Sequence, residues 1–331
     1  MTTPHHAPIS VALFNDTGDS CHVGCQAVSQ AHRHMLRREG ADIRHAFFLN
    51  DWRHLANAVL DEGIRQALAS RELRDVLADV DVVVVNGEGT IHHQGGRHLL
   101  AILGAAQRLG VPTLLVNAVL QDIDDARDVL AAVSDCTVRD AYTSRYLDSL
   151  GVAHRLIPDS FFEAHFLDTP RHDFAESLVI TDCHVNRAAE CAPQLSQLRD
   201  AWPGRVADYP LKAQERLDDW QHALADVRRA DVVVTGRHHG ACLALRAGVP
   251  FVTLPSTTWK VEGLIATLDG YPVDAADASR PLVERVSVAR AHRRWFGEQA
   301  VRWKDVLPLP TFAHLRRVRT RPRATEPGCA A

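Results

Sequence analysis

Short apolar runs alternate with longer stretches of helical periodicity through the first half of the chain. The run Asp81-Val-Val-Val-Val-Asn86 is β-branched and apolar at consecutive positions, which is typical of a strand covered on both faces in a parallel sheet. Similar runs predict strands over 9–14, 44–49, 113–117, 135–138 and 153–157. Apolar residues at helical spacing predict helices over 26–38, 52–79, 99–109 and 141–150. This regular alternation predicts a parallel sheet wrapped by helices.

The alternation weakens over residues 164–176 and then begins again. This segment holds a proline, several charges and no apolar period, so we place a domain boundary there. The pattern then predicts strands over 178–181, at 206, over 231–235 and over 249–254. It predicts helices over 189–202, 213–229 and 281–303, and a helix that follows the turn at 236–240 and ends at 247. The sequence thus predicts an N-terminal domain over 1–165, a C-terminal domain over 175–318 and a disordered tail over 319–331.

The two halves of the chain repeat one another at a buried strand. The sequence Asp-Val-Val-Val-Val-Asn-Gly-Glu-Gly begins at residue 81, and Asp-Val-Val-Val-Thr-Gly-Arg-His-His-Gly begins at residue 231. This echo predicts two similar α/β domains that face one another. In such sheets ligands gather at the carboxyl ends of the strands, so we expect a ligand cleft between the domains.

Composition agrees with a globular protein of two domains. Lys and Arg number 37 against 41 Asp and Glu, a formal net charge of −4, so the chain has no broad basic field for nucleic acid. No apolar run approaches the length of a membrane span, and the first residues show no signal-peptide pattern. The seven cysteines include no C-x-x-C pair, which favours free thiols in a cytoplasmic enzyme.

Two polar clusters follow predicted strands of the first domain. The cluster at 15–24 offers glycines and a helix N-terminus to an anion, and an ordinary capped turn is the alternative. In the cluster at 86–93, two glycines flank Glu88. Glu88 would act as a base or bind a hydroxyl, and the alternative is a cap for the next helix. The adjacent His92 and His93 lack the further ligands that a metal site needs.

Two more clusters contain arginine. Arg139 follows a strand and opens a helix, where its fork can bind a carboxylate or phosphate, and a salt bridge with Asp140 or Asp159 is the alternative. The turn Gly-Arg-His-His-Gly at 236–240 joins a buried strand to a helix of small residues. Positive charge, a helix N-terminus and a titratable proton meet there, which suits an anionic substrate whose reaction needs proton transfer.

The chain resembles the polysaccharide pyruvyl transferase family. The matching residues extend over most of the chain: Asn15, Gly18, Asp19 and Gly24; the valine strand with Gly87 and Gly89; Arg139-Asp140 with Ser144, Leu147 and Gly151; Pro158-Asp159; Gly236 to Gly240 with Ala244 and Gly248-Val-Pro250; and Lys260 with Gly263-Leu264. The Arg-x-His-Gly segment with its Gly-x-Pro follower is moderately specific, whereas the valine-glycine turns are not. Glu88 stands where a third glycine is common in the family, and the opening loop carries Cys21 and His22.

The resemblance implies an α/β fold of two Rossmann-like domains facing a central cleft, in a GT-B-like arrangement. It implies phosphoenolpyruvate as the donor and co-substrate, a sugar as the acceptor, and a pyruvate ketal and phosphate as products, with no metal or other cofactor. Expected catalytic residues are His239 as the acid, Glu88 as the base (with His92 or His93 as alternatives) and Arg237 at the donor. The expected donor-binding residues are Arg139, Arg237, His238, His239, Gly240 and Lys260. The expected acceptor-binding residues are Asn15, Gly18, Asp19, His22, Gly87, Gly89, Thr90, His92 and His93.

Two other functions stay open from the sequence: a GT-B-type glycosyltransferase that uses a nucleotide sugar, and a non-catalytic carbohydrate-assembly or ligand-binding protein. We expect a cytoplasmic protein whose sugar acceptor is free, lipid-linked or nucleotide-linked, and no nucleic acid partner. Arginines around Trp295 and Phe296 could contact the inner face of the cytoplasmic membrane, and a helix that packs back across both domains is the alternative. The sequence leaves the oligomeric state open, with a homo-oligomer among the options.

Overall fold

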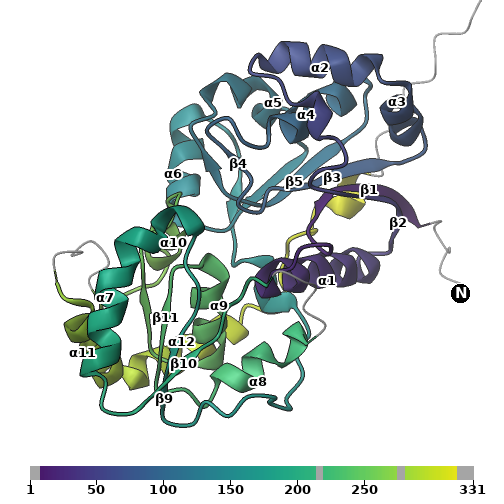
Figure 1. Cartoon of the computed structure of the whole chain (residues 1–331). Coiled ribbons are helices and arrows are strands. Elements are labelled where there is room, and N and C mark those ends of the chain that lie inside the picture. Colours follow the sequence, from purple (N-terminus) through teal and green to yellow (C-terminus); the bar gives the residue numbers. More distant parts are fainter. Residues whose placement is uncertain (1–7, 214–218, 274–279, 319–331) are drawn as a thin grey trace, which may run out of the picture.

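Two fully parallel sheets organise the chain, one from each half of the sequence (Figure 1). The computed structural model describes residues 8–213, 219–273 and 280–318. The first sheet has six strands in the order β2-β1-β3-β5-β7-β8, and the second has four in the order β10-β9-β11-β12. Strands β4 and β6 form a separate parallel pair.

The strands are short and mostly buried. The first sheet contains β1 (Ile9–Asp16), β2 (Ala41–Phe48), β3 (Val82–Asn86), β5 (Thr113–Ala118), β7 (Asp135–Val138) and β8 (Arg155–Leu156). The second contains β9 (Ser177–Ile180), β10 (Arg205–Asp208), β11 (Val232–Thr235) and β12 (Phe251–Thr253), and the separate pair is β4 (Ile91–His92) and β6 (Leu120–Gln121).

Helices cover the sheets. Those of the first half are α1 (Val23–Arg38), α2 (Leu60–Ala69), α3 (Arg71–Ala78), α4 (Arg97–Arg108), α5 (Arg127–Ala131) and α6 (Ala141–Leu150). Those of the second half are α7 (Ala188–Ala201), α8 (Ala223–Val227), α9 (His238–Ala247), α10 (Lys260–Ile265), α11 (Leu282–Ala291), α12 (Arg293–Lys304) and α13 (Leu315–Val318). Asp140 caps α6 by accepting from the backbone N–H groups of Tyr142 and Thr143, and Gly151 ends it in the left-handed conformation.

The predicted alternation of strands and helices is confirmed, with differences in the helices. The helix expected over 281–303 is divided into α11 and α12 at His292. The stretch 52–79 is broken into a 3-10 turn and two helices, with Ser70 between α2 and α3. The single helix expected over 213–229 is not found in the described residues 219–229, which form a 3-10 turn (Trp220–His222) and the short α8, and residues 214–218 lie outside the described part. Lys212 instead forms an isolated β-bridge with His22. The tail expected over 319–331 also lies outside the described residues.

Both sheets reverse their strand order at an equivalent place. The second strand of each domain lies on one side of the first strand and the third lies on the other, so the reversal falls between β1 and β3 and between β9 and β11. Ligands of open parallel sheets bind outside the carboxyl ends of the strands at such reversals. The two Asp-Val-Val-Val strands, β3 and β11, are the third strand of their sheets, which explains the repeat in the sequence.

The two domains share one apolar core. A single buried cluster joins α1 and one face of the first sheet to the second sheet, with Val28 and Val233 among its members. A second cluster lies between the other face of the first sheet and helices α2 to α4. The change from the first sheet to the second falls between β8 and β9, on either side of the predicted boundary.

The segment that packs back on the first domain follows α12. Phe312 and Leu315 are buried in the shared core, and the Arg155 guanidinium donates to the Pro310 carbonyl at 3.0 Å. Helix α12 packs on α9 of its own domain, with Phe296 buried and Trp295 against the Tyr271 ring. Phe296 therefore belongs to the core, and Trp295 is a partly buried ring packed against it.

No helix in the described ranges is both long and apolar enough to cross a bilayer. The six described cysteines are all free thiols, in agreement with the expectation from their spacing.

Candidate active site

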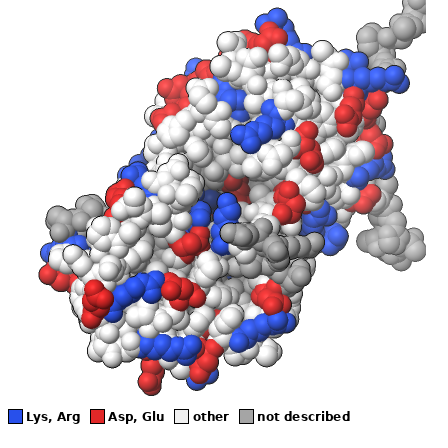
Figure 2. All heavy atoms as spheres, viewed as in Figure 1, with Lys and Arg blue, Asp and Glu red and all other residues white. Residues whose placement is uncertain are grey.

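A polar cavity of about 440 Å³ lies between the two sheets, at the carboxyl ends of β1, β3 and β11. Lys and Arg side chains gather at the junction of the two domains in the middle of Figure 2. The cavity wall consists of Asn15, Thr17, Asp19, Ser20, His22, Cys25, Leu49, Asn50, Glu88, Gly89, Thr90, Arg139, Arg237, His238, His239 and Lys260. Both reversal points of the sheets therefore contribute side chains to one cavity.

Most of the site residues expected from the sequence line this cavity. On the first-domain side these are Asn15, Asp19, His22, Glu88, Gly89, Thr90 and Arg139, and on the second-domain side they are Arg237, His238, His239 and Lys260. The two predicted sides thus face one another across the cavity.

Three glycines expected at the site have packing roles instead. A Cβ on Gly87 would lie 2.6 Å from the Ala118 Cβ, and a Cβ on Gly240 would lie 2.1 Å from the Thr235 hydroxyl. A Cβ on Gly18 would lie 2.7 Å from the Ser29 hydroxyl. These residues let neighbouring elements approach closely, and none of the three lines the cavity.

The two adjacent histidines, His92 and His93, also lie outside the cavity wall. His93 Nδ1 contacts the Asp122 carboxylate at 2.7 Å, and the two imidazole rings meet edge to face. His92 lies in strand β4, which pairs with β6, and His93 follows it directly, so the acceptor role of the two histidines stays a prediction.

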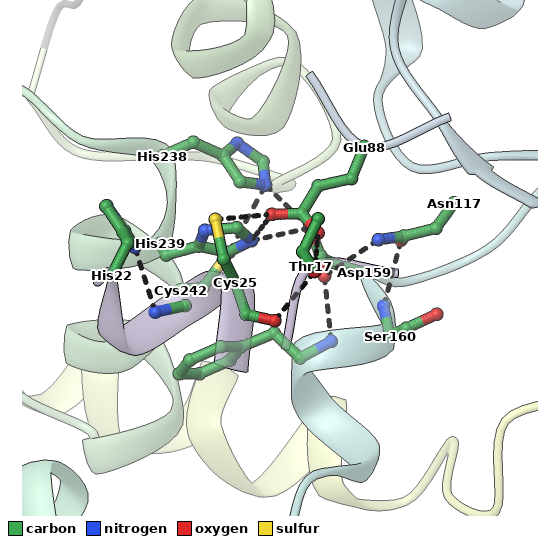
Figure 3. Close-up of polar contacts among 12 residues, drawn as sticks. Thr17, His22, Cys25, Glu88, Asn117, Asp159, Ser160, His238, His239 and Cys242 are labelled. Carbon is green, nitrogen blue, oxygen red and sulfur yellow. Dashed lines mark hydrogen bonds and ion pairs between the residues drawn. The ribbon is translucent and has the colours of Figure 1, made fainter. Parts of the chain in front are cut away.

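Glu88 is fixed in the cavity by hydrogen bonds to both carboxylate oxygens. The Cys25 thiol donates to Oε1 at 3.3 Å, and the Thr17 hydroxyl and Asn86 amide donate to Oε2 at 3.2 and 3.3 Å. His239 Nε2 lies 3.5 Å from Oε1 (Figure 3). The helix-cap alternative for Glu88 is wrong, because β4 follows it and α4 begins only after Gly96.

A buried ion pair and two histidines meet at Asp159. The Arg139 guanidinium donates to Asp159 Oδ2 at 2.6 Å, so the salt-bridge alternative for this arginine is found. His238 Nε2 lies 2.9 Å and His239 Nε2 3.6 Å from the same oxygen (Figure 3). The Phe161 backbone N–H donates to Oδ1 at 2.7 Å. Burial opposes ionisation of Asp159, but Arg139 and the two histidines hold its pKa well below the usual value.

Arg237 forms an ion pair with Asp182, which also accepts a hydrogen bond from the backbone at the junction of the two domains. Its Nε donates to Asp182 Oδ2 at 2.6 Å, while Asp182 Oδ1 accepts from the Leu211 backbone N–H at 2.8 Å. The Leu211 carbonyl in turn accepts from the Val23 backbone N–H at 2.9 Å, at the start of α1. The orientation of Arg237 is therefore tied to the contact between the two domains.

Lys260 is a partly buried cation without a carboxylate partner among the described residues. Burial first, and then the charges of Arg139 and Arg237, lower the pKa of Lys260 to about 8. Trp259 anchors this turn across the cavity, because its indole N–H donates to the Thr143 hydroxyl at 3.4 Å and its ring meets that of Tyr146. The ammonium group thus lines the cavity beside the two arginines.

His239 is wedged between the two domains. Its ring stacks on Phe161 with centroids 5.7 Å apart, and a Cβ on Gly24 would lie 2.0 Å from its Cγ. His22 meets the same ring edge to face and caps α1 by accepting from the Gly24 backbone N–H through Nδ1 at 3.0 Å. Burial, followed by His239, lowers the pKa of His22 well below its ordinary value.

Two polar atoms at the cavity lack a hydrogen-bond partner: Asn15 Oδ1 and Arg139 Nε. The Asn15 amide nitrogen donates to the Asn86 carbonyl at 2.6 Å, which leaves the oxygen free. Asn15 also has φ +58, at a register shift in β1. A strained residue with a free buried acceptor at a strand end is typical of a ligand site.

Within the part of the chain that the structure describes, two groups of side chains are close enough to hold a metal ion: His22, Cys25 and His239, and Asp159, His238 and His239. In the first, burial and then Glu88 raise the pKa of Cys25 well above its ordinary value, which opposes the thiolate that a metal needs. In the second, the Arg139 guanidinium already occupies the Asp159 carboxylate. We therefore treat both groups as hydrogen-bonded clusters and assign no metal to them.

Several site residues were missed from the sequence. Asp159 and Asp182 pair with the two cavity arginines, and Asp159 was considered only as a partner of Arg139. The cavity wall also contains Thr17, Ser20, Cys25, Leu49 and Asn50. Thr17 and Ser20 lie in the glycine-bearing cluster at 15–24 and Cys25 directly follows it, whereas Leu49 and Asn50 follow β2 and carry no motif.

Comparison with protein families and solved structures agrees with this geometry. The model of the polysaccharide pyruvyl transferase family matches residues 22–257, the bulk of the chain. No curated protein sequence gives a significant match to this chain.

The fold is shared with GT-B enzymes at low sequence identity. The spinosyn rhamnosyltransferase SpnG is 15% identical with a TM-score of 0.55, covering 94% of this chain and 100% of its own. MurG from Acinetobacter baumannii is 13% identical with a TM-score of 0.54, covering 95% and 100%. The UDP-GlcNAc 2-epimerase from Methanocaldococcus jannaschii is 13% identical with a TM-score of 0.51, covering 92% and 100%. The two Rossmann-like domains of the present chain have the GT-B arrangement. The chain belongs to the polysaccharide pyruvyl transferase family.

Proposed function

We propose that this protein transfers a pyruvyl group from phosphoenolpyruvate to a sugar of a polysaccharide or its precursor, forming a pyruvate ketal and releasing phosphate. The observation that carries the proposal is Lys260, a partly buried ammonium on the cavity wall that has no ion pair with any described residue. A buried unpaired charge is unfavourable, and an anionic ligand relieves it. Arg139 and Arg237 line the same cavity and add further donors for a carboxylate and a phosphate.

The donor chemistry needs a proton at the methylene carbon. His239 is assigned this proton transfer, because it lines the cavity and its Nε2 lies between the carboxylates of Glu88 and Asp159, at 3.5 and 3.6 Å. Protonation of the methylene makes C2 electrophilic. A sugar hydroxyl then forms a C–O bond to C2, a second hydroxyl of the same sugar forms another, and the C2–O bond to phosphate breaks with its electron pair leaving on phosphate.

The two sugar hydroxyls lose one proton each during this reaction. Glu88 lies on the first-domain side and contacts His239, so we assign to it the removal of the first hydroxyl proton. The second proton leaves with the departing phosphate. The free Asn15 Oδ1 accepts a hydrogen bond from a sugar hydroxyl in this scheme, with Asp19 and Thr90 beside it on the wall.

Transfer of a sugar from a nucleotide is the second candidate. The observation that favours it is the N-terminus of α9 at the cavity, where Arg237 and the helix dipole would also bind a diphosphate. The two candidates differ in the donor, because a nucleotide brings a base and a ribose that phosphoenolpyruvate lacks.

Calorimetric titration separates the candidates. We expect wild-type protein to bind phosphoenolpyruvate, and Lys260→Met to bind it at least tenfold more weakly because a buried charge contact is lost. Lys304→Met is the matched control, since that lysine is exposed at the end of α12. Binding of a nucleoside diphosphate sugar without any binding of phosphoenolpyruvate would overturn the proposal in favour of the second candidate.

A further inference from the structure

The imidazole of His238 has an oxygen in hydrogen-bond contact with each ring nitrogen. Nδ1 lies 3.0 Å from the backbone carbonyl of Lys260, and Nε2 lies 2.9 Å from Asp159 Oδ2. The side chain is 3% exposed, so water does not stand in for either partner. The proton content of this ring therefore follows from which of these contacts need a donor.

The contact at Nδ1 fixes one proton. A carbonyl oxygen can only accept, so Nδ1 must carry the hydrogen that joins it to Lys260. A neutral imidazole has a single N–H, which would leave Nε2 as a lone pair facing the Asp159 oxygen. Two lone pairs 2.9 Å apart in a water-free site repel one another, so a second proton lies between His238 and Asp159.

The surroundings of Asp159 place that second proton on the ring. Its Oδ2 accepts from the Arg139 guanidinium at 2.6 Å, and its Oδ1 accepts from the Phe161 backbone N–H at 2.7 Å. Hydrogen bonds from an arginine and from backbone N–H groups stabilise the ionised carboxylate. Asp159 therefore acts as an acceptor toward His238.

We propose that His238 is a buried imidazolium and a positioning residue, so that the trio Arg139–Asp159–His238 carries a net charge of plus one beneath the cavity. In this state Asp159 is shared between two cations, and Arg139 keeps part of its charge for a ligand. The proposal concerns the ionisation of the unliganded protein and does not rest on the function proposed above. Its consequence for the site is an anion-binding cavity whose positive charge exceeds what its paired arginines provide.

Other groups near the ring act in both directions. Burial first, and then the Arg139 charge, lower the pKa of His238 to about 3, which by itself would leave the ring neutral. Asp159 acts in the opposite direction, and His239 acts against the charge. The Cys242 thiol lies 3.5 Å from Nε2 on the same helix, and burial, followed by Asp159, raises its pKa so that it stays a neutral thiol. Burial thus favours a neutral His238 ring, whereas the contacts with the Lys260 carbonyl and Asp159 favour a charged one. We give the contacts more weight, because a neutral ring can donate to only one of these two oxygens.

The same cavity holds an internal reference for the measurement. His22 Nδ1 accepts a hydrogen bond from the Gly24 backbone N–H, so this Nδ1 carries a lone pair and His22 is a neutral ring with its proton on Nε2. His22 and His238 are therefore expected in different ionisation states. The backbone N–H of Gly24 faces Nδ1 of His22, whereas the backbone carbonyl of Lys260 faces Nδ1 of His238.

Nitrogen NMR of protein labelled with ¹⁵N-histidine tests the proposal. At pH 7.5 we expect His238 to show two nearly equal ring-nitrogen shifts, as an imidazolium does, and His22 to show two widely separated shifts. His238→Gln identifies the His238 signals by their loss, and Cys242→Ala identifies them by perturbation if the first variant does not fold. Widely separated shifts for His238, with its proton on either nitrogen, would overturn the proposal.

Discussion

Among single residues, Lys260 gives the first prediction, which concerns the free energy of unfolding. The pKa of Lys260 in the folded protein, about 8, lies below the ordinary value of 10.5, so the charged form is disfavoured in the folded protein. Lys260→Met removes this unfavourable charge and should raise the free energy of unfolding at pH 7 by about 1–3 kcal/mol. Urea denaturation of the unliganded protein measures the change. A variant that is less stable than wild type would show that Lys260 has a partner which balances its charge.

The same residue sets a pH dependence for ligand binding. An anion prefers the protonated lysine, so its affinity should be nearly constant below pH 8 and should fall by up to tenfold per pH unit above it. The stability of the unliganded protein should move the other way, because the unfolded state binds more protons between pH 8 and 10.5. Calorimetry with phosphoenolpyruvate from pH 7 to 9.5 records the first effect. A Lys260→Met protein should lose this pH dependence, and a retained one would assign it to another group.

His239 carries the proposed proton transfer and gives the third prediction. His239→Gln should lower turnover by a factor of roughly a hundred to ten thousand, the usual range for general acid catalysis. His93→Gln is the control, because His93 is half-exposed outside the cavity wall. Phosphate release in the presence of donor and acceptor measures both. If His93→Gln were the more damaging change, the acceptor site would lie near β4 and the assignment would fail.

Residue types were predicted from the sequence more readily than their pairing. Arg237 and His239 were expected because an arginine and a histidine follow a buried strand at a helix start. Asp182 was missed because it lies more than fifty positions earlier and meets Arg237 only through the parallel pairing of β9 and β11. Short-range pattern can thus identify a chemical group but not its long-range partner.

At the scale of elements, the start of α1 packs closely on α9 because Gly24 has no side chain where it meets the His239 ring. Gly24→Ala would place a Cβ 2.0 Å from the His239 ring, so either the ring or α1 has to move. We expect a loss of stability of about 1–3 kcal/mol and a larger loss of activity, since His239 is displaced. Gly297→Ala in α12 is the control: nothing lies within 4 Å of its Cβ, and alanine should stabilise the helix by about 0.5–1 kcal/mol. Thermal denaturation compares the two variants. Equal effects would show that the contact between α1 and α9 is loose.

Elements with strong local signals were predicted closely. Helix α6 agrees with the expected range 141–150, because Asp140 caps it and Gly151 ends it. The segment 213–229 carries helical periodicity, yet its first residues are held by the other domain: the Ala213 backbone N–H donates to the Cys21 carbonyl at 2.9 Å. A long-range backbone contact of this kind leaves no mark in the local pattern.

At the scale of the whole molecule, the cavity exists only because two domains meet. Glu88 and Arg139 come from the first sheet, and Arg237, His239 and Lys260 come from the second half of the chain. The repeat at residues 81 and 231 predicted two similar α/β domains that face one another, and the structure has a parallel sheet in each half of the chain with the cavity between them. The shared core and the return of residues 309–318 to the first domain could not be foreseen, since they depend on packing between distant segments.

The central claim is that this cavity holds phosphoenolpyruvate as the donor. A crystal structure of the protein with phosphoenolpyruvate tests it most directly. The account predicts an anionic group of the ligand in contact with the Lys260 ammonium and the Arg237 guanidinium, and the methylene carbon facing His239. The account would be contradicted if phosphoenolpyruvate bound away from Lys260. It would also be contradicted if crystals prepared with each ligand showed a nucleotide sugar in the cavity but no phosphoenolpyruvate.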